Sequence, residues 1–355
     1  MILIPEINVL IADDSPLTRK ILKALIESDK SLRIIGVARD GIEAVEKANK
    51  LNPDVIIMDI KMPNMDGLTA LQYILEEKNI PVIVVSSLGE KSSIIAYEAL
   101  ELGAFDYIEK PDDLYYLKDE LIKKIHAAYI FSQSEEAKKE FFSEKDISYQ
   151  PKEKKETETN IEMDFYGVTI GISTGGPREI YDVLPKFPAN LNAAIFLVQH
   201  IPEKFTKTYA ERLNNSCELK VVEAENDMDV KPGYVYVGKG GYHLKLRKGL
   251  NGLKIMLSKT PRTIFMPSAD ILMESVLEHF NNKTIGVLMT GMGDDGAKAM
   301  VKIKENNGYT IAESEETAVV FGMPAEAIRL GGANIVLPSY MIANEVIEKV
   351  GLRNG

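Results

Sequence analysis

The sequence predicts two doubly wound α/β domains joined by a charged linker. In both halves, short apolar runs of strand length alternate with amphipathic stretches of helical period, a pattern typical of parallel sheets covered by helices. The chain has 355 residues, which is enough for two full hydrophobic cores. Residues 132–160 are rich in Glu, Lys, Ser, Thr and Gln and poor in apolar residues, which indicates a linker.

In the first half, polar side chains follow the apolar runs that we expect to form buried parallel strands. The carboxyl ends of parallel strands meet at one edge of a sheet, where doubly wound proteins bind ligands. The polar residues there are Asp13, Asp14, Asp59, Ser86 and Lys110, following the runs 7–12, 55–58, 82–85 and 105–108. The intervening helices are predicted at 17–26, 42–51, 68–75 and 94–102.

Three carboxylates in one pocket repel each other unless a cation neutralises them, and oxygen ligands favour Mg²⁺. Such a pocket suits a phosphoryl group, since Lys110 can neutralise its oxygens, Ser86 can donate to one, and Asp59 can attack phosphorus. The alternative is that these aspartates only cap helices or are solvated turn residues. That alternative is adequate for one aspartate but not for the whole spaced set.

The motifs Asp13-Asp14, 58–67 around Asp59, Ser86 and Lys110-Pro111 resemble those of two-component receiver domains over residues 5–128. The resemblance implies a flavodoxin-like (βα)5 fold with Asp59 as the phosphoacceptor. It also implies that Asp13, Asp14 and Asp59 hold Mg²⁺, that Ser86 is the switch hydroxyl and that Lys110 binds the phosphoryl group.

The second half opens with an apolar run that enters the glycine-rich turn Gly171-x-Ser173-x-Gly175. A sharp strand-to-helix turn of this kind exposes the serine hydroxyl near helix amides. Glycine-rich turns also bind phosphate or serve packing, so the pattern alone leaves those readings open.

A nucleophilic serine requires a base, and the sequence has four histidines. Only His200 follows a buried strand, the run Ala193–Gln199, at the edge expected for Ser173; we expect His126, His243 and His279 to be packed or solvated. A third strand leads to Asp294 and Asp295, and either carboxylate could orient the imidazole or cap the next helix.

The segments 171–177, 199–202 and 290–296, with 321–324, resemble the catalytic domain of the CheB family of chemotaxis protein-glutamate methylesterases over residues 163–349. The resemblance implies a catalytic Ser173, His200 and Asp295, with Thr174 and Met292 lining the site and assisting oxyanion stabilisation. It places Asp294 at a variable position. Arg178 could meet substrate charge, but we expect it to be solvated. We expect the basic run 239–248 to form a strand of an antiparallel hairpin.

The two resemblances together imply phosphorylation-activated hydrolysis of glutamyl methyl esters on chemoreceptors, with methanol released, and deamidation of receptor glutamines. The implied partners are methyl-accepting chemoreceptors and a chemotaxis histidine kinase. Mg²⁺ is expected in the receiver and no cofactor in the esterase site. The predicted domains are a receiver at 5–128, a linker at 129–162 and a catalytic domain at 163–349.

Composition and the absence of certain sequence patterns argue against nucleic-acid-binding, membrane-spanning and secreted proteins. The net charge of −11 and the lack of a helix-turn-helix pattern argue against a nucleic-acid-binding output. No apolar run is long enough to cross a membrane and the N-terminus lacks signal-peptide features, so we expect a cytoplasmic protein without membrane insertion. A catalytically silent docking module, with a structural Ser173, remains the alternative to an esterase.

Overall fold

The structure is a computed structural model that describes residues 6–87, 90–134, 165–250 and 252–353. The chain divides into two compact units, Met1–Ser143 and Glu144–Gly355. Most of the predicted linker lies outside the described residues, and the domain boundaries stay predictions. In the described part of the chain, no helix combines the length and the apolar character needed to cross a membrane.

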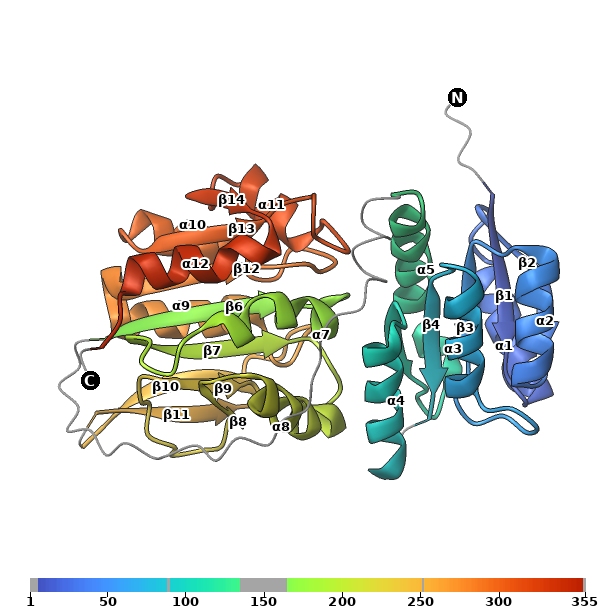
Figure 1. Ribbon diagram of the computed structural model, residues 1–355, viewed down its shortest axis with the longest axis horizontal. Coiled ribbons are helices and arrows are strands. Elements are labelled where there is room, and N and C mark those ends of the chain that lie inside the picture. The colour runs from blue at the N-terminus through green and yellow to red at the C-terminus, as the bar shows by residue number, and fades with distance from the viewer. Residues whose placement is uncertain (1–5, 88–89, 135–164, 251, 354–355) are drawn as a thin grey trace. The chain divides into compact units, whose positions relative to one another are not determined.

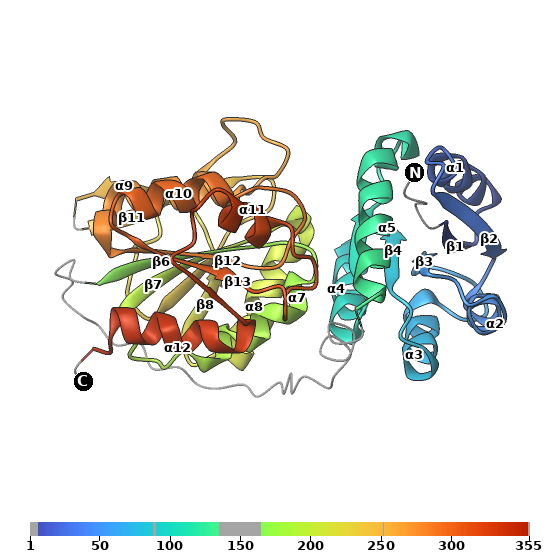
Figure 2. The same cartoon turned by 90° about the horizontal axis from the view of Figure 1, so that it is seen from above.

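The first unit is a five-stranded parallel sheet of order β2-β1-β3-β4-β5. Figure 2 shows α1 and α5 on one face of the sheet and α2, α3 and α4 on the other. The elements are β1 Ile7–Ala12, α1 Pro16–Ile26, β2 Leu32–Ala38, α2 Gly41–Leu51, β3 Val55–Met58, α3 Gly67–Glu77, β4 Val82–Ser86, α4 Glu90–Leu102, β5 Asp106–Glu109 and α5 Lys118–Ser132.

Local sequence explains where these helices begin. Ser15, Asp40 and Asp66 each cap a helix by accepting a hydrogen bond from a backbone N–H three residues later. The strands β1, β3 and β4 are buried on both faces, which accounts for their continuous apolar sequences. The predicted alternation of strands and helices in this unit is confirmed.

The second unit is built on a seven-stranded, wholly parallel sheet of order β14-β13-β12-β6-β7-β9-β8 (Figure 1). Its strands are β6 Tyr166–Ile172, β7 Ala193–Gln199, β8 Lys220–Glu223, β9 Tyr234–Val237, β12 Thr284–Leu288, β13 Tyr309–Glu313 and β14 Ile335–Leu337. Its helices are α7 Gly176–Glu179, α8 Thr206–Ser216, α9 Ala269–Phe280, α10 Ala297–Glu305, α11 Met323–Arg329 and α12 Ser339–Val350. The antiparallel hairpin pairs β10 His243–Gly249 with β11 Gly252–Ser258, as predicted.

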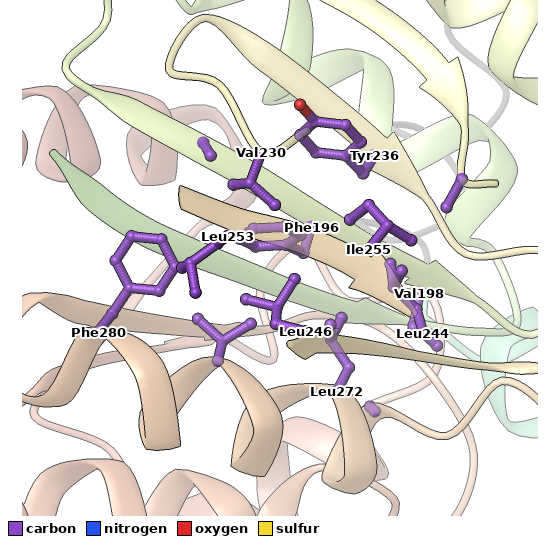
Figure 3. Packing of buried hydrophobic residues seen from close by; sticks show 14 of the residues in the cluster. Phe196, Val198, Val230, Tyr236, Leu244, Leu246, Leu253, Ile255, Leu272 and Phe280 are labelled. Carbon is purple, nitrogen blue, oxygen red and sulfur yellow. The ribbon is translucent and has the colours of Figure 1, made fainter. Parts of the chain in front are cut away.

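Helices cover both faces of this larger sheet. In Figure 2, α9, α10 and α11 lie on one face and α8 and α12 on the other. Figure 3 shows one core cluster, in which Leu272 and Phe280 of α9 pack towards Phe196 of β7 and Leu246 and Ile255 of the hairpin. This apolar packing fixes both α9 and the hairpin against the sheet.

Each sheet has a topological switch point that positions a site. In the first unit, the chain passes from β1 to β2 on one side and then crosses from β2 to β3 on the other side of β1. In the second, the chain runs outward from β6 through β7 and later returns to β12 on the other side of β6. Ligands bind at the carboxyl ends of strands at such points, and the predicted site residues follow these strands.

Candidate functional site

Ser173 and His200 come after neighbouring parallel strands. Ile172 is in register with Gln199, and the His200 N–H donates to the Ile172 carbonyl oxygen at 3.1 Å. Ser173 and His200 are therefore the next pair along strands that lie about 4.8 Å apart. Ser173 is 8% exposed, so the residue is largely buried at this end of the sheet.

The glycine-rich turn brings α7 close to the sheet. Gly175 has φ +81°, a conformation that favours glycine, and a Cβ there would lie 2.5 Å from Val319 Cβ. A Cβ at Gly176 would lie 2.3 Å from Gln199 Oε1. The glycines thus permit a close approach that larger residues would prevent, and this approach fixes the turn that contains Ser173.

The other side of Ser173 is formed by the segment that follows β12. The Ser173 N–H donates to the Thr290 carbonyl oxygen at 2.9 Å. A Cβ at Gly291 would lie 2.7 Å from Ser173 Cβ and 2.3 Å from Met323 Sδ. Ser173 is therefore held between the extensions of β7 and β12.

Asp295, rather than Asp294, lies against the histidine. His200 Nε2 is 2.9 Å from Asp295 Oδ2, and both side chains are buried. Asp294 is exposed, and its nearest cation is Lys298 at 3.9 Å. The contact supports the assignment of the orienting role to Asp295.

Asp295 is fixed by the start of α9. Ser268 Oγ donates to Asp295 Oδ1 at 2.7 Å, the Ala269 N–H donates to Oδ2 at 2.7 Å, and the Asp270 N–H donates to Oδ1 at 3.1 Å. Burial opposes the ionised form, but the hydrogen bond and charge of His200 and these donors outweigh it and lower the pKa of Asp295. The carboxylate is therefore ionised at neutral pH.

The His200 ring has two further features. Its other nitrogen, Nδ1, is buried and has no hydrogen-bond partner among the described residues. The ring stacks on Phe265, with centroids 4.2 Å apart and an interplanar angle of 3°. If Nε2 carries the ring proton and donates the hydrogen bond to Asp295, Nδ1 keeps the lone pair that a general base needs.

Phe265 and Ser268 are site residues that the sequence analysis missed. Ser268 had a detectable signal, because a serine directly before an apolar helix is a typical N-cap, and it caps α9 by accepting from the Ile271 N–H. Phe265 had none, since nothing local places an aromatic ring in a loop against a distant imidazole. The other expected site residues, Thr174 and Met292, are buried and half-buried, respectively.

The expectation that Arg178 is solvated is wrong. Arg178 is only 8% exposed, and burial lowers the pKa of its guanidinium despite the nearby Glu179 and Asp182. Its helix, α7, begins at Gly176, where the close approach to Gln199 brings the whole first turn into the interior. The predictions for His126, His243 and His279 are confirmed: they lie in α5, β10 and α9 and make structural contacts.

In the first unit, the acidic residues converge as predicted. One carboxylate oxygen from each of Asp13, Asp14 and Asp59 lies within 4.8 Å of the others. Lys110 Nζ is 2.6 Å from Asp13 Oδ2 and also contacts Asp59, while Ser86 Oγ donates to Asp59 Oδ1 at 2.6 Å. All five side chains therefore meet around Asp59.

Burial and charge oppose each other in this pocket. Burial raises the pKa of Asp13, although Lys110 acts in the opposite direction. Burial disfavours the charged form of Lys110, but the carboxylates of Asp59 and Asp13 outweigh it and raise the lysine pKa. One lysine cannot neutralise three carboxylates, so the all-oxygen cluster has the donor set and the excess negative charge that suit a hard divalent cation.

Comparison with known proteins identifies a family for each of the two units. The family model for CheB methylesterase matches residues 168–346, and that for the response regulator receiver domain matches residues 9–125. The protein-glutamate methylesterase/protein-glutamine glutaminase 3 of Syntrophomonas wolfei is 49% identical over 97% of this chain and 99% of its own. The protein-glutamate methylesterase/protein-glutamine glutaminase 2 of Carboxydothermus hydrogenoformans is 46% identical over 97% of this chain and 99% of its own.

A solved structure supports the fold of the second unit. The CheB methylesterase catalytic domain of Thermotoga maritima is 43% identical and has a TM-score of 0.51, covering 52% of this chain and 99% of its own. From the two family models and the nearly full-length relatives, we conclude that the chain belongs to the CheB family of receiver-regulated protein-glutamate methylesterases.

Proposed function

We propose that the chain hydrolyses glutamyl methyl esters on chemoreceptors and releases methanol, with Ser173, His200 and Asp295 as the catalytic residues. The observation that carries the proposal is the contact between His200 Nε2 and Asp295 at 2.9 Å, on an imidazole in the register position beside Ser173. A nucleophile, a base and an orienting carboxylate are the components of acyl transfer at a serine.

In the first half-reaction, His200 Nδ1 accepts the proton of Ser173 Oγ as the oxygen attacks the γ-carbonyl carbon. Asp295 stabilises the resulting imidazolium through Nε2–H. The imidazolium then gives its proton to the departing methoxy oxygen, so that methanol leaves an acyl-enzyme. In the second half-reaction, water attacks the acyl-enzyme in the same way, which releases a glutamate and regenerates Ser173.

The same chemistry extends to glutamine, whose γ-carbonyl is attacked in the same way with ammonia as the leaving group. We assign Thr174 and Met292 to the lining of the site and to oxyanion stabilisation. Their positions support this role, because Thr174 directly follows Ser173 and Met292 directly follows Gly291, where an added Cβ would clash with Ser173.

The first unit regulates this activity through phosphorylation of Asp59, with Ser86 as the switch hydroxyl. The carboxylates of Asp13, Asp14 and Asp59 would hold Mg²⁺, which neutralises phosphoryl oxygens when bound. Lys110, whose Nζ contacts Asp13 and Asp59, would bind the phosphoryl group. A chemotaxis histidine kinase is the proposed phosphodonor and the cytoplasm the proposed location.

Regulation would act by release of autoinhibition. A phosphoryl group adds about two negative charges to the Asp59 pocket. Each change of ~1.4 kcal/mol in the free energy difference between the autoinhibited and the active state alters the ratio of the two states about tenfold. The fragment 160–355 should therefore hydrolyse substrate faster than the unphosphorylated whole chain. Equal rates for the two would contradict autoinhibition.

Methanol release from a methylated chemoreceptor tests the proposed function, with Ser173→Ala as the blank. Release should require Ser173 and rise when Mg²⁺ and a small phosphodonor are added. A fluorophosphonate should label Ser173 only when His200 is present. Absence of both signals would instead support a docking module in which Ser173 is structural.

A further inference from the structure

The 230–269 segment differs in charge from the rest of the chain. It contains eight lysines and arginines and no aspartate or glutamate, in a protein of net charge −11. Two of its cations are neutralised by acidic residues outside the segment, Arg247 by Asp227 and Lys254 by Asp229. The segment therefore keeps a local positive charge in a protein that is acidic as a whole.

Two cations of this segment lie in the 259–265 loop, which connects β11 to α9. Lys259 and Arg262 are exposed, and neither has an acidic partner in the described part of the chain. Lys259 Nζ lies 4.7 Å from the centroid of the Tyr242 ring. Ile264, which follows both cations in the sequence, is 94% exposed.

The same loop contacts the catalytic histidine. Phe265 stacks on His200 at 4.2 Å between ring centroids, and Arg262 is three residues earlier. Three residues span at most about 11 Å of backbone. A substrate carboxylate one helical turn, about 5.4 Å, or two turns from the reacting group would lie within reach of the Arg262 side chain.

Internal contacts hold this loop in place. His243, buried in β10, makes a hydrogen bond of 2.7 Å from Nε2 to the Pro261 carbonyl oxygen and accepts from the Ser268 N–H at Nδ1. Lys245 Nζ donates to the Thr260 carbonyl oxygen at 3.1 Å. The loop is therefore tied to β10 near both of its ends, which reduces the entropy lost when it binds a partner.

We propose that the 259–265 loop is a substrate-binding element that recognises an acidic protein segment, with Arg262 and Lys259 binding carboxylates that flank the reacting glutamyl group. This inference rests on the proposed function. Hydrolysis itself produces a glutamate, so neighbouring sites that have already been processed present the carboxylates that these cations suit. Arg262 can bind one carboxylate in bidentate fashion, and the exposed Ile264, between Arg262 and Phe265 in the sequence, adds an apolar contact.

The test compares Arg262→Glu with Lys248→Glu in the full chain. Lys248 is exposed, belongs to the same basic segment and undergoes the same charge change, but it lies at the far end of β10, about 17 Å along the strand from His243. For each variant, kcat/KM is measured on a methylated chemoreceptor cytoplasmic fragment and on a small uncharged ester.

In Arg262→Glu, the ratio of receptor to small-ester kcat/KM should fall at least tenfold, mainly through KM, and the deficit should shrink in 0.5 M salt because of charge screening. In Lys248→Glu the ratio should stay within about twofold of the original. An unchanged ratio in Arg262→Glu, or an equal fall in both variants, would overturn the proposal.

Binding separates this inference from the proposed function. The Ser173→Ala chain should bind the methylated fragment at least tenfold more tightly than the Ser173→Ala, Arg262→Glu chain. Equal Kd values would reject the binding role of the loop, whatever the catalytic outcome. Absence of Ser173-dependent methanol release, with the Kd difference intact, would reject only the proposed reaction.

Discussion

Replacement of Asp295 by asparagine tests the central contact of the esterase site. The carboxylate accepts four hydrogen bonds, from His200, Ser268, Ala269 and Asp270. An asparagine amide has only one oxygen, and each carboxylate oxygen accepts two of these bonds, so its NH₂ group must face two of the donors. The substitution keeps the size of the side chain but removes both the charge and part of the acceptor set.

The expected loss in kcat is about 10⁴-fold, the cost of the wrong histidine tautomer at a serine site, which corresponds to about 5.5 kcal/mol. Stability should fall by only about 2 kcal/mol, because one of the two donors that face the NH₂ group is a buried backbone N–H, which loses its acceptor. Since the pKa of Asp295 is lowered, its carboxylate stays ionised between pH 5 and 9. The loss should therefore be present throughout that range.

The assay is methanol release at saturating substrate, with urea denaturation to monitor folding. Asp294→Asn is the matched control, since it makes the same chemical change at the adjacent, exposed residue and should change kcat less than twofold. Activity of Asp295→Asn within tenfold of the original, or an equal loss in Asp294→Asn, would refute the assignment of the orienting role to Asp295.

Three further predictions concern the receiver, the Ser173 turn and pH. Chelation of Mg²⁺ or the substitution Asp59→Asn should abolish labelling by a small phosphodonor, and persistent labelling would exclude Asp59 as the acceptor. Gly291→Ala should destabilise the second unit by about 1–3 kcal/mol and slow fluorophosphonate labelling at least tenfold, because its Cβ would clash with Ser173 and Met323. The hydrogen bonds from Ser31, and then the contact with His126, lower the pKa of Asp29 to about 2, so its stabilisation is present above about pH 4 and is lost as pH falls towards 2. Asp29→Asn should therefore cost about 1 kcal/mol at pH 7 in urea denaturation and progressively less below pH 4; a constant cost would contradict the shift.

The sequence by itself determined the alternation of strands and helices, because burial of a parallel sheet on both faces requires the continuous apolar runs that it contains. The predicted strands Ile7–Ala12, Val55–Met58 and Ala193–Gln199 match β1, β3 and β7. The convergence of Asp13, Asp14 and Asp59 also followed, since residues after parallel strands meet at one sheet edge.

Tertiary structure alone decided which side chains make contact across long stretches of sequence. Local pattern could not distinguish Asp294 from Asp295, because either can cap a helix. In the folded chain their surroundings differ, since the first N–H groups of α9 bind Asp295 and Asp294 is exposed. The stacking of Phe265 on His200 and the burial of Arg178 likewise depend on how loops and helices pack. Sequence periodicity indicates which face of a helix or strand is buried. It does not indicate which distant element covers that face, and the contacts of Asp295, Phe265 and Arg178 depend on the covering element.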